Sequence, residues 1–173
     1  TEKLRGTVHA KIQRMINRNP HRMDFLEEYR QMIEEYNNGS RNVEELFDEL
    51  VDLAHRLDEE EKRTIAENLS EEELAVFDYL TRPGPDLTEK EREEVKNIAR
   101  QMLETLKEEK LVLDWRKRQQ SRAAVRVLIE DMVWDLPQSY SDDQCEQKSQ
   151  AIYQHVYDKY WGAWSAGQSV YAG

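Results

Sequence analysis

The sequence predicts an all-α protein with about seven helices and no significant sheet, and three observations carry this prediction. Apolar residues recur at spacings of three and four almost from end to end, as in helices that bury one face. Several stretches begin with the residue pattern of a helix-capping box. Short clusters of asparagine, glycine and proline between the apolar stripes mark turns. We expect a single domain over residues 1–164 and a poorly ordered tail over residues 165–173.

The first three helices follow from apolar stripes in the N-terminal part. Residues 8–16 carry a short stripe, residues 25–36 a second one and residues 43–57 a third. The first stripe stops before Pro20, and the polar cluster at residues 37–40 separates the second from the third. Both interruptions are typical of turns between helices.

Four more helices are expected in the C-terminal part. The first begins at Ser70 and the last at Ser141, and the two between them, at roughly 88–109 and 114–136, are expected to be the longest in the chain. The Pro-Gly-Pro run within residues 82–86 is short, which indicates a tight connector inside one domain. Residues 110–113 are the only strand-like run, and we expect an extended link there.

Capping patterns mark four of the predicted helix starts. Ser70, Thr88 and Ser141 are each followed three residues later by Glu or Gln, and Asn42 with Glu45 is a looser version. In a capping box the side chain of the first residue accepts a hydrogen bond from a free backbone N–H of the helix. The side chain of the third residue after it accepts one from the backbone N–H of the first residue. These positions are therefore predicted helix N-termini.

Composition excludes several classes of protein. The 173 residues carry 25 Lys and Arg against 36 Asp and Glu, so the formal charge is 25 − 36 = −11. This balance disfavours a chain that binds nucleic acid over its whole surface, because phosphate binding needs a basic surface. No run approaches the roughly 18 apolar residues of a membrane span, and the first residues have no signal-peptide core. The lone Cys145 excludes an internal disulfide, so we expect a cytoplasmic protein with no membrane partner.

Motifs for catalysis and cofactor binding are not found. None of the six glycines precedes a lysine, which excludes a phosphate-binding P-loop, and none of the four histidines has the Glu-x-x-His spacing of a metal-binding bundle. Asp86 with Glu108 and Lys110 matches the spelling of a nuclease motif. However, Asp86 lies in the connector and Glu108 ends a helix, so chance explains the match better. We expect no catalytic residue, metal or cofactor in this chain.

Cysteine and tryptophan have packing roles in this interpretation. Cys145 lies at the start of the last helix, where a helix N-terminus can lower a thiol pKa, but neighbouring acids act in the opposite direction. We therefore expect a packing cysteine. Trp115 and Trp134 bracket the long helix predicted at 114–136 and are expected to be core or junction residues. Trp161 and Trp164 end the last helix, where packing is the more common role and an interface the alternative.

Two clusters of basic residues form the candidate binding surface. The candidates are Arg116, Lys117, Arg118, Arg122, Arg126, Lys11, Arg14 and Arg18. No acid lies between residues 115 and 129, and Arg118, Arg122 and Arg126 are expected on one helix face, where like charges repel. Either acids of neighbouring helices, for example at 58–61 and 89–94, or an external phosphate or acidic protein surface must compensate them.

Two long runs and several short segments form a recognisable pattern. Residues 69–83 read LSEEELAVFDYLTRP and residues 111–125 read LVLDWRKRQQSRAAV, with shorter matches at 33–37, 43–46, 147–148 and 153–157. Over residues 8–161 the chain resembles the C-terminal helical domain of type I restriction enzyme R subunits, the motor and nuclease subunit. The pattern includes Asp114, Trp115, Arg116, Gln120, Arg122 and Ala123, but it does not state their roles.

The resemblance implies a division of labour in the parent subunit. The N-terminal part of such subunits carries the nuclease, two RecA-like lobes use ATP and Mg to translocate DNA, and the C-terminal helices help dock the subunit. It therefore implies a non-catalytic assembly domain whose partners are the methyltransferase and specificity subunits and, through the whole assembly, DNA. A chain that begins with threonine suits an excised fragment. The alternative is a helical domain that contacts DNA or a nucleotide through the Arg116–Arg126 stripe.

Overall fold

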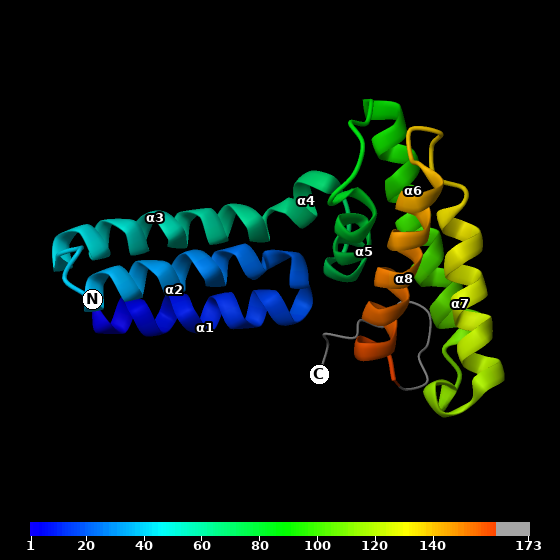
Figure 1. Cartoon of the computed structure of the whole chain (residues 1–173), viewed down its shortest axis with the longest axis horizontal. Coiled ribbons are helices and arrows are strands. Elements are labelled where there is room, and N and C mark those ends of the chain that lie inside the picture. The colour runs from blue at the N-terminus through cyan, green and yellow to red at the C-terminus, as the bar shows by residue number, and fades with distance from the viewer. Residues whose placement is uncertain (162–173) are drawn as a thin grey trace. The chain divides into compact units, whose positions relative to one another are not determined.

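The computed structural model describes residues 1–161, and this part of the chain consists of helices and turns without a strand (Figure 1). Seven of the described α-helices have 11 to 19 residues, and α4 has five. The all-α prediction is confirmed. The tail predicted at residues 165–173 lies outside the described residues.

The chain divides into two compact units, one over Thr1–Glu71 and one that begins at Glu72. The single domain expected over residues 1–164 stays a prediction. No helix in the described part combines the length and the apolar character needed to cross a membrane.

The first unit is a bundle of three helices that lie side by side (Figure 1). These helices are α1 (Glu2–Arg18), α2 (Met23–Asn37) and α3 (Val43–Glu61), and the short α4 (Arg63–Glu67) follows. Their apolar stripes meet in one core, formed by Val8, Ile12, Met15, Leu26, Met32, Leu46, Leu50, Leu53 and Leu57. The buried leucines of α3 recur at spacings of three and four, so the predicted stripe is the buried face of the helix.

Two glycines of the first unit are expected to respond in opposite ways to replacement by alanine. Gly39 follows α2 with φ +83°, a left-handed conformation in which an added Cβ is strained, so Gly39→Ala is expected to lower the free energy of unfolding by about 1–2 kcal/mol. Gly6 lies inside α1, and an added Cβ would meet nothing within 4 Å, so Gly6→Ala is expected to raise it by about 0.5–1 kcal/mol. Urea unfolding followed by circular dichroism measures both, and shifts in the same direction would contradict the prediction.

The second unit begins with α5 (Glu71–Thr81), of which only the first residue, Glu71, belongs to the first unit. Three longer helices follow. These are α6 (Glu89–Thr105), α7 (Gln119–Val133) and α8 (Asp142–Lys159). Helix α5 holds the continuous apolar run 74–77 and is buried over most of its residues, as expected for a helix that is apolar on more than one face. Helices α7 and α8 pack against each other (Figure 1). Val125 and Ile129 of α7 and Ile152 of α8 are fully buried.

Capping boxes begin α3, α6 and α8 as predicted. In each of them the cap side chain accepts from the backbone of the third residue, and that residue's side chain accepts from the cap backbone. At α3, for example, the Glu45 N–H lies 2.9 Å from Asn42 Oδ1, and the Asn42 N–H lies 3.0 Å from Glu45 Oε2. The looser pattern at Asn42 is thus a complete box.

The prediction of the longest helices is wrong for the segment 114–136. The longest α-helices among residues 1–161 are α3 with 19 residues and α8 with 18, whereas α6 has 17 and continues as a π-helical turn over Leu106–Lys110. Helix α7 has only 15 residues, because Asp114 adopts a left-handed φ of 57° and Trp115–Lys117 form a 3-10 turn before it. Residues 111 and 112 are an irregular link, as expected for the strand-like run.

Candidate functional site

The basic cluster of the second unit lies around the start of α7. Arg118 has an extended backbone, with φ −113° and ψ 124°, and directly precedes the helix. Of the three arginines expected on one helix face, only Arg122 and Arg126 therefore belong to α7. The predicted helical stripe is shorter than expected, because the helix begins at Gln119.

Aromatic side chains of α8 hold two of these arginines. The Arg116 guanidinium carbon lies 4.9 Å from the centre of the Tyr157 ring, and its Nη1 donates to the Tyr157 carbonyl oxygen at 2.8 Å. The Arg126 guanidinium carbon lies 4.4 Å from the centre of the Tyr153 ring. A cation–π contact fixes the place of a positive charge without neutralising it. Helix α8 thus serves as a platform for the basic cluster.

Acids do not neutralise most of this cluster within residues 1–161. Arg122 donates to the Arg116 carbonyl oxygen at 2.7 Å, and Arg118 is exposed. Of the five basic residues only Lys117 has a carboxylate partner in that range, Asp114 at 3.8 Å, and both side chains are more than half exposed. Of the two alternatives, pairing with acids of neighbouring helices is therefore not observed for the four arginines within residues 1–161, and contact with an outside partner stays a prediction.

The basic stripe on α1 belongs to the first unit and behaves differently. Lys11 Nζ pairs with Asp58 and, at 2.7 Å, with Glu61, both at the end of α3. Hydrogen bonds to these two carboxylates raise the pKa of Lys11. The alternative of pairing with the acids at 58–61 is therefore realised for this residue. Arg14 and Arg18 are exposed on the same helix.

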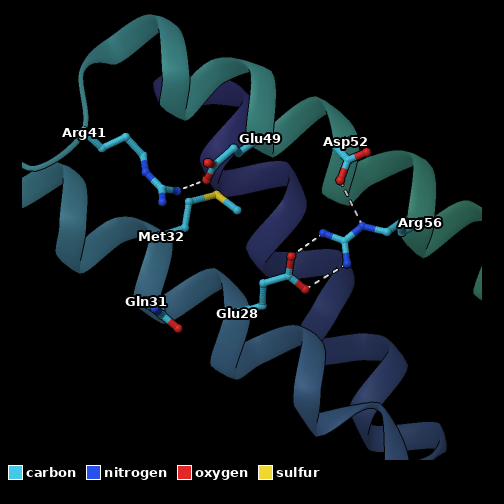
Figure 2. Close-up of a pocket in the computed structure, with 7 residues that line it drawn as sticks. All are labelled: Glu28, Gln31, Met32, Arg41, Glu49, Asp52 and Arg56. Carbon is cyan, nitrogen blue, oxygen red and sulfur yellow. Dashed lines mark hydrogen bonds and ion pairs between the residues drawn. The ribbon is translucent and has the colours of Figure 1, made fainter.

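A cavity of about 360 Å³ lies between α2 and α3 of the first unit (Figure 2). Its lining consists of Glu28, Gln31, Met32, Arg41, Glu49, Asp52 and Arg56. Figure 2 shows that the arginines face carboxylates: Arg41 pairs with Glu49 and Arg56 with Glu28 and Asp52. Because carboxylates already neutralise both guanidinium groups, this cavity is not an anion site. Its lining residues form an ion-pair network that joins the two helices. None of its lining residues is among the candidates predicted from the sequence, although the Asp52–Arg56 spacing of four residues is a helix-pairing signal.

A second ion-pair group of the first unit involves the buried side chain of Arg22. Arg22 is 2% exposed, and its Nε donates to Glu60 Oε2 at 2.9 Å, while Arg63 Nη1 approaches the same carboxylate at 2.9 Å. Burial by itself raises the pKa of Glu60, but the hydrogen bonds from Arg22 and Arg63 outweigh it and hold this pKa below 4.5.

Glu60 is therefore expected to make the stability of the protein depend on pH. A carboxylate whose pKa is lowered in the folded state stabilises the protein above its unfolded-state pKa, and this contribution is lost as the pH falls through the folded-state value. Glu60→Gln is expected to be less stable than the wild type near neutral pH, and the difference is expected to shrink below pH 4.5. Urea unfolding across this range measures the effect. Glu59→Gln, whose pair with Lys62 is exposed, is the control and is expected to change little at either pH.

A buried polar network connects distant segments of the second unit. Lys107 Nζ lies 2.9 Å from Glu72 Oε2, and the Tyr160 hydroxyl donates to Glu72 Oε1 at 2.6 Å. The indole N–H of Trp115 donates to the carbonyl oxygen of Tyr160. These four residues lie on α5, the π-helical turn, the end of α8 and the 3-10 turn, so the network stabilises the arrangement of these segments.

Four of the six residues that carry the resemblance around Trp115 have an identifiable structural role. Asp114 forms the left-handed turn, Trp115 is fully buried, and Arg116 and Arg122 bind backbone carbonyls. Gln120 and Ala123, by contrast, are exposed on α7.

The residues considered for chemistry form no metal-binding group in the described part of the chain. Within residues 1–161, no three His, Cys, Asp or Glu side chains are close enough to hold a metal ion, and Asp86 and Glu108 are both exposed. Cys145 is buried, and burial and the charge of Asp142 raise the pKa of its thiol, which confirms the packing role.

The tryptophans differ from one another. Trp115 is a core residue, as predicted. Trp134 is 54% exposed and directly follows Val133, the last residue of α7, so of the two roles expected for it the core role is wrong and the junction role is the one observed. Trp161 is also exposed, and Trp164 lies outside the described residues.

The helices and the basic cluster define an all-α protein whose described part places arginines at the surface of one helix pair. The chain belongs to the family of type I restriction enzyme HindI endonuclease subunit-like C-terminal domains, whose family model matches residues 1–158. This match confirms the resemblance noted over residues 8–161. A comparison with curated proteins and one with solved structures find no match.

Proposed function

We propose that this chain is a non-catalytic assembly domain of a type I restriction enzyme. In this proposal it helps the motor subunit dock onto the methyltransferase and specificity subunits in the cytoplasm, during ATP-dependent DNA translocation and cleavage. The family supports the class of the parent protein. ATP and Mg belong to other parts of that subunit in this proposal, and the chain itself holds no cofactor.

One observation carries the proposal. Arg116, Arg118, Arg122 and Arg126 have no carboxylate partner within residues 1–161, and the rings of α8 hold two of them in place. Positive charges that are fixed before binding lose less conformational freedom when they meet an anionic partner. An acidic surface on the methyltransferase–specificity core would supply that partner, and charge-assisted hydrogen bonds from guanidinium to carboxylate would add specificity.

A pull-down of the methyltransferase–specificity complex with this chain tests the proposal at low and at high salt. In the test variant, Arg118, Arg122 and Arg126 are replaced by Ala. In the control variant, the exposed Lys3, Lys62 and Lys90 are replaced by Ala, which removes the same amount of positive charge. We expect the test variant to bind at least about tenfold more weakly and the control to bind like the wild type. Circular dichroism verifies that both are folded. Equal binding by the test variant, or no binding by the wild type at low salt, would contradict the proposal.

The same arginines favour a second candidate function, direct contact with DNA or a nucleotide. Neutralising phosphates releases counterions, so log Kobs falls with log salt with a slope of about −0.9 per phosphate. Titration of a labelled DNA duplex at several salt concentrations measures this slope. A steep slope in the wild type that the triple-alanine variant loses would support DNA contact, whereas weak binding with little salt dependence would reject it. The net charge of −11 acts against this candidate.

A further inference from the structure

We propose that the groove between α7 and α8 binds a helical protein segment that is acidic at one end and basic at the other. This inference rests on the proposed assembly function and names the chemistry of the segment that docks. The groove is defined by two adjoining hollows of about 480 and 320 Å³. Both are lined by Glu130 of α7 and by Ser149 and Gln150 of α8, so they form one continuous depression along the helix pair.

The two ends of this α7–α8 groove have opposite charge. Arg126, held over Tyr153, lines one end, and the other arginines of the basic cluster lie farther toward the start of α7. Asp142, Asp143 and Glu146 line the opposite end. All three acids are exposed, and none of them has an ion-pair partner within residues 1–161. A segment of uniform charge would be repelled at one end, whereas a segment with two oppositely charged ends matches both.

Exposed apolar side chains provide the anchors for such a segment. Trp134, the residue directly after α7, lines the acidic end and is 54% exposed, whereas Val127 of α7 lies beside the groove, outside the lining of both hollows, and is 52% exposed. They are seven residues apart, which places them on the same face of α7, about 10 Å from each other. Helices that dock in grooves present apolar anchors at this spacing. A cationic side chain of the segment would also stack on the indole of Trp134 while it meets the acids.

The length of the surface sets the size of the segment. Arg118 and Trp134 are sixteen residues apart, which corresponds to about 24 Å along a helix. A helix of about 16 residues would therefore bring one charged end to the basic cluster and the other to the acids. Helix α7 itself carries basic residues toward one end and acidic residues toward the other, as the docking segment would. A second copy of the chain is therefore the competing occupant of the groove.

The test uses labelled helical peptides and the full 173-residue chain, read by fluorescence anisotropy. One peptide of about 18 residues has two leucines seven apart, Glu at one end and Arg at the other, and the second has the same composition with Glu and Arg alternating. We expect the first peptide to bind at least about tenfold more tightly. Val127→Glu and Trp134→Ala are each expected to weaken that binding by at least about tenfold. Replacing Asp142, Asp143 and Glu146 by their amides is expected to abolish the preference for the first peptide.

Matched controls make the result specific to this groove. Ile65→Glu, at a side chain that is 83% exposed in the first unit, is the control for Val127→Glu, and Trp161→Ala is the control for Trp134→Ala. Both are expected to bind like the wild type. Equal binding of the two peptides, or equal losses in control and test variants, would overturn the inference. Self-association of the wild type that Val127→Glu abolishes, measured by analytical ultracentrifugation, would also overturn it, because a second copy would then be the occupant.

Failure of this inference can be told apart from failure of the proposed function. Val127→Glu is also used in the pull-down of the methyltransferase–specificity complex. If the wild type and Val127→Glu capture the complex equally well, the assembly function stands and the groove is not the docking site. If the wild type captures nothing, the assembly function fails, and the peptide experiment still reports on the groove.

Discussion

Lys107→Met is expected to lower the free energy of unfolding by about 3–5 kcal/mol, because it leaves the Glu72 carboxylate buried without its cationic partner. The two side chains are 8% and 6% exposed, and Nζ lies 2.9 Å from Oε2. Water cannot replace the lysine in so enclosed a place without rearrangement of the surrounding helices. Urea unfolding followed by circular dichroism measures the loss.

The matched control for this variant is Lys117→Met, which removes a lysine from an exposed pair in the same unit. Lys117 and Asp114 are 80% and 51% exposed, so we expect a loss of at most about 1 kcal/mol. Adding Glu72→Gln to Lys107→Met removes the stranded charge while the amide oxygen still accepts from the Tyr160 hydroxyl. The double variant is therefore expected to be more stable than Lys107→Met alone. A cost for Lys107→Met no larger than that of the control would contradict this account.

The sequence predicts the helices of this protein well because their signals are local. The capping boxes at Asn42, Thr88 and Ser141 each involve residues only three apart, and the leucine stripe of α3 needs no knowledge of its neighbours. The start of α7 is missed because no such local signal marks it. Arg118 makes no side-chain cap, and the left-handed residue before the 3-10 turn is Asp114 and not a glycine.

The candidate site could be predicted only in part. The basic residues near α7 are evident in the sequence, but the compensation of a charge depends on which helices pack together. Lys11 forms ion pairs with acids that lie 47 and 50 residues away in the sequence, on α3, while Arg126 stacks on the ring of Tyr153 on α8. Helix α7 ends at Val133, three residues before the predicted end, and Trp134, which follows directly, is exposed.

The second large effect is expected at Trp115. Trp115→Ala is expected to lower the free energy of unfolding by about 3–5 kcal/mol, because the residue is fully buried and its removal leaves a large cavity. Its ring lies edge-on to Tyr153 and Tyr157, with centroid distances of 6.4 and 5.9 Å. Trp134→Ala, the same substitution at an exposed site, is expected to change stability by no more than about 0.5 kcal/mol.

Trp115→Phe separates packing from hydrogen bonding at this position. Phenylalanine keeps an aromatic ring against α8 but cannot donate to the Tyr160 carbonyl oxygen, so we expect a smaller loss, of about 1–3 kcal/mol. Arg116 follows directly and stacks on Tyr157, so a shift of the turn that holds Trp115 also moves the basic cluster. A folded Trp115→Phe protein is therefore expected to bind the methyltransferase–specificity complex more weakly than Trp115 wild type. Unchanged stability in both Trp115 variants would show that the turn does not depend on this side chain.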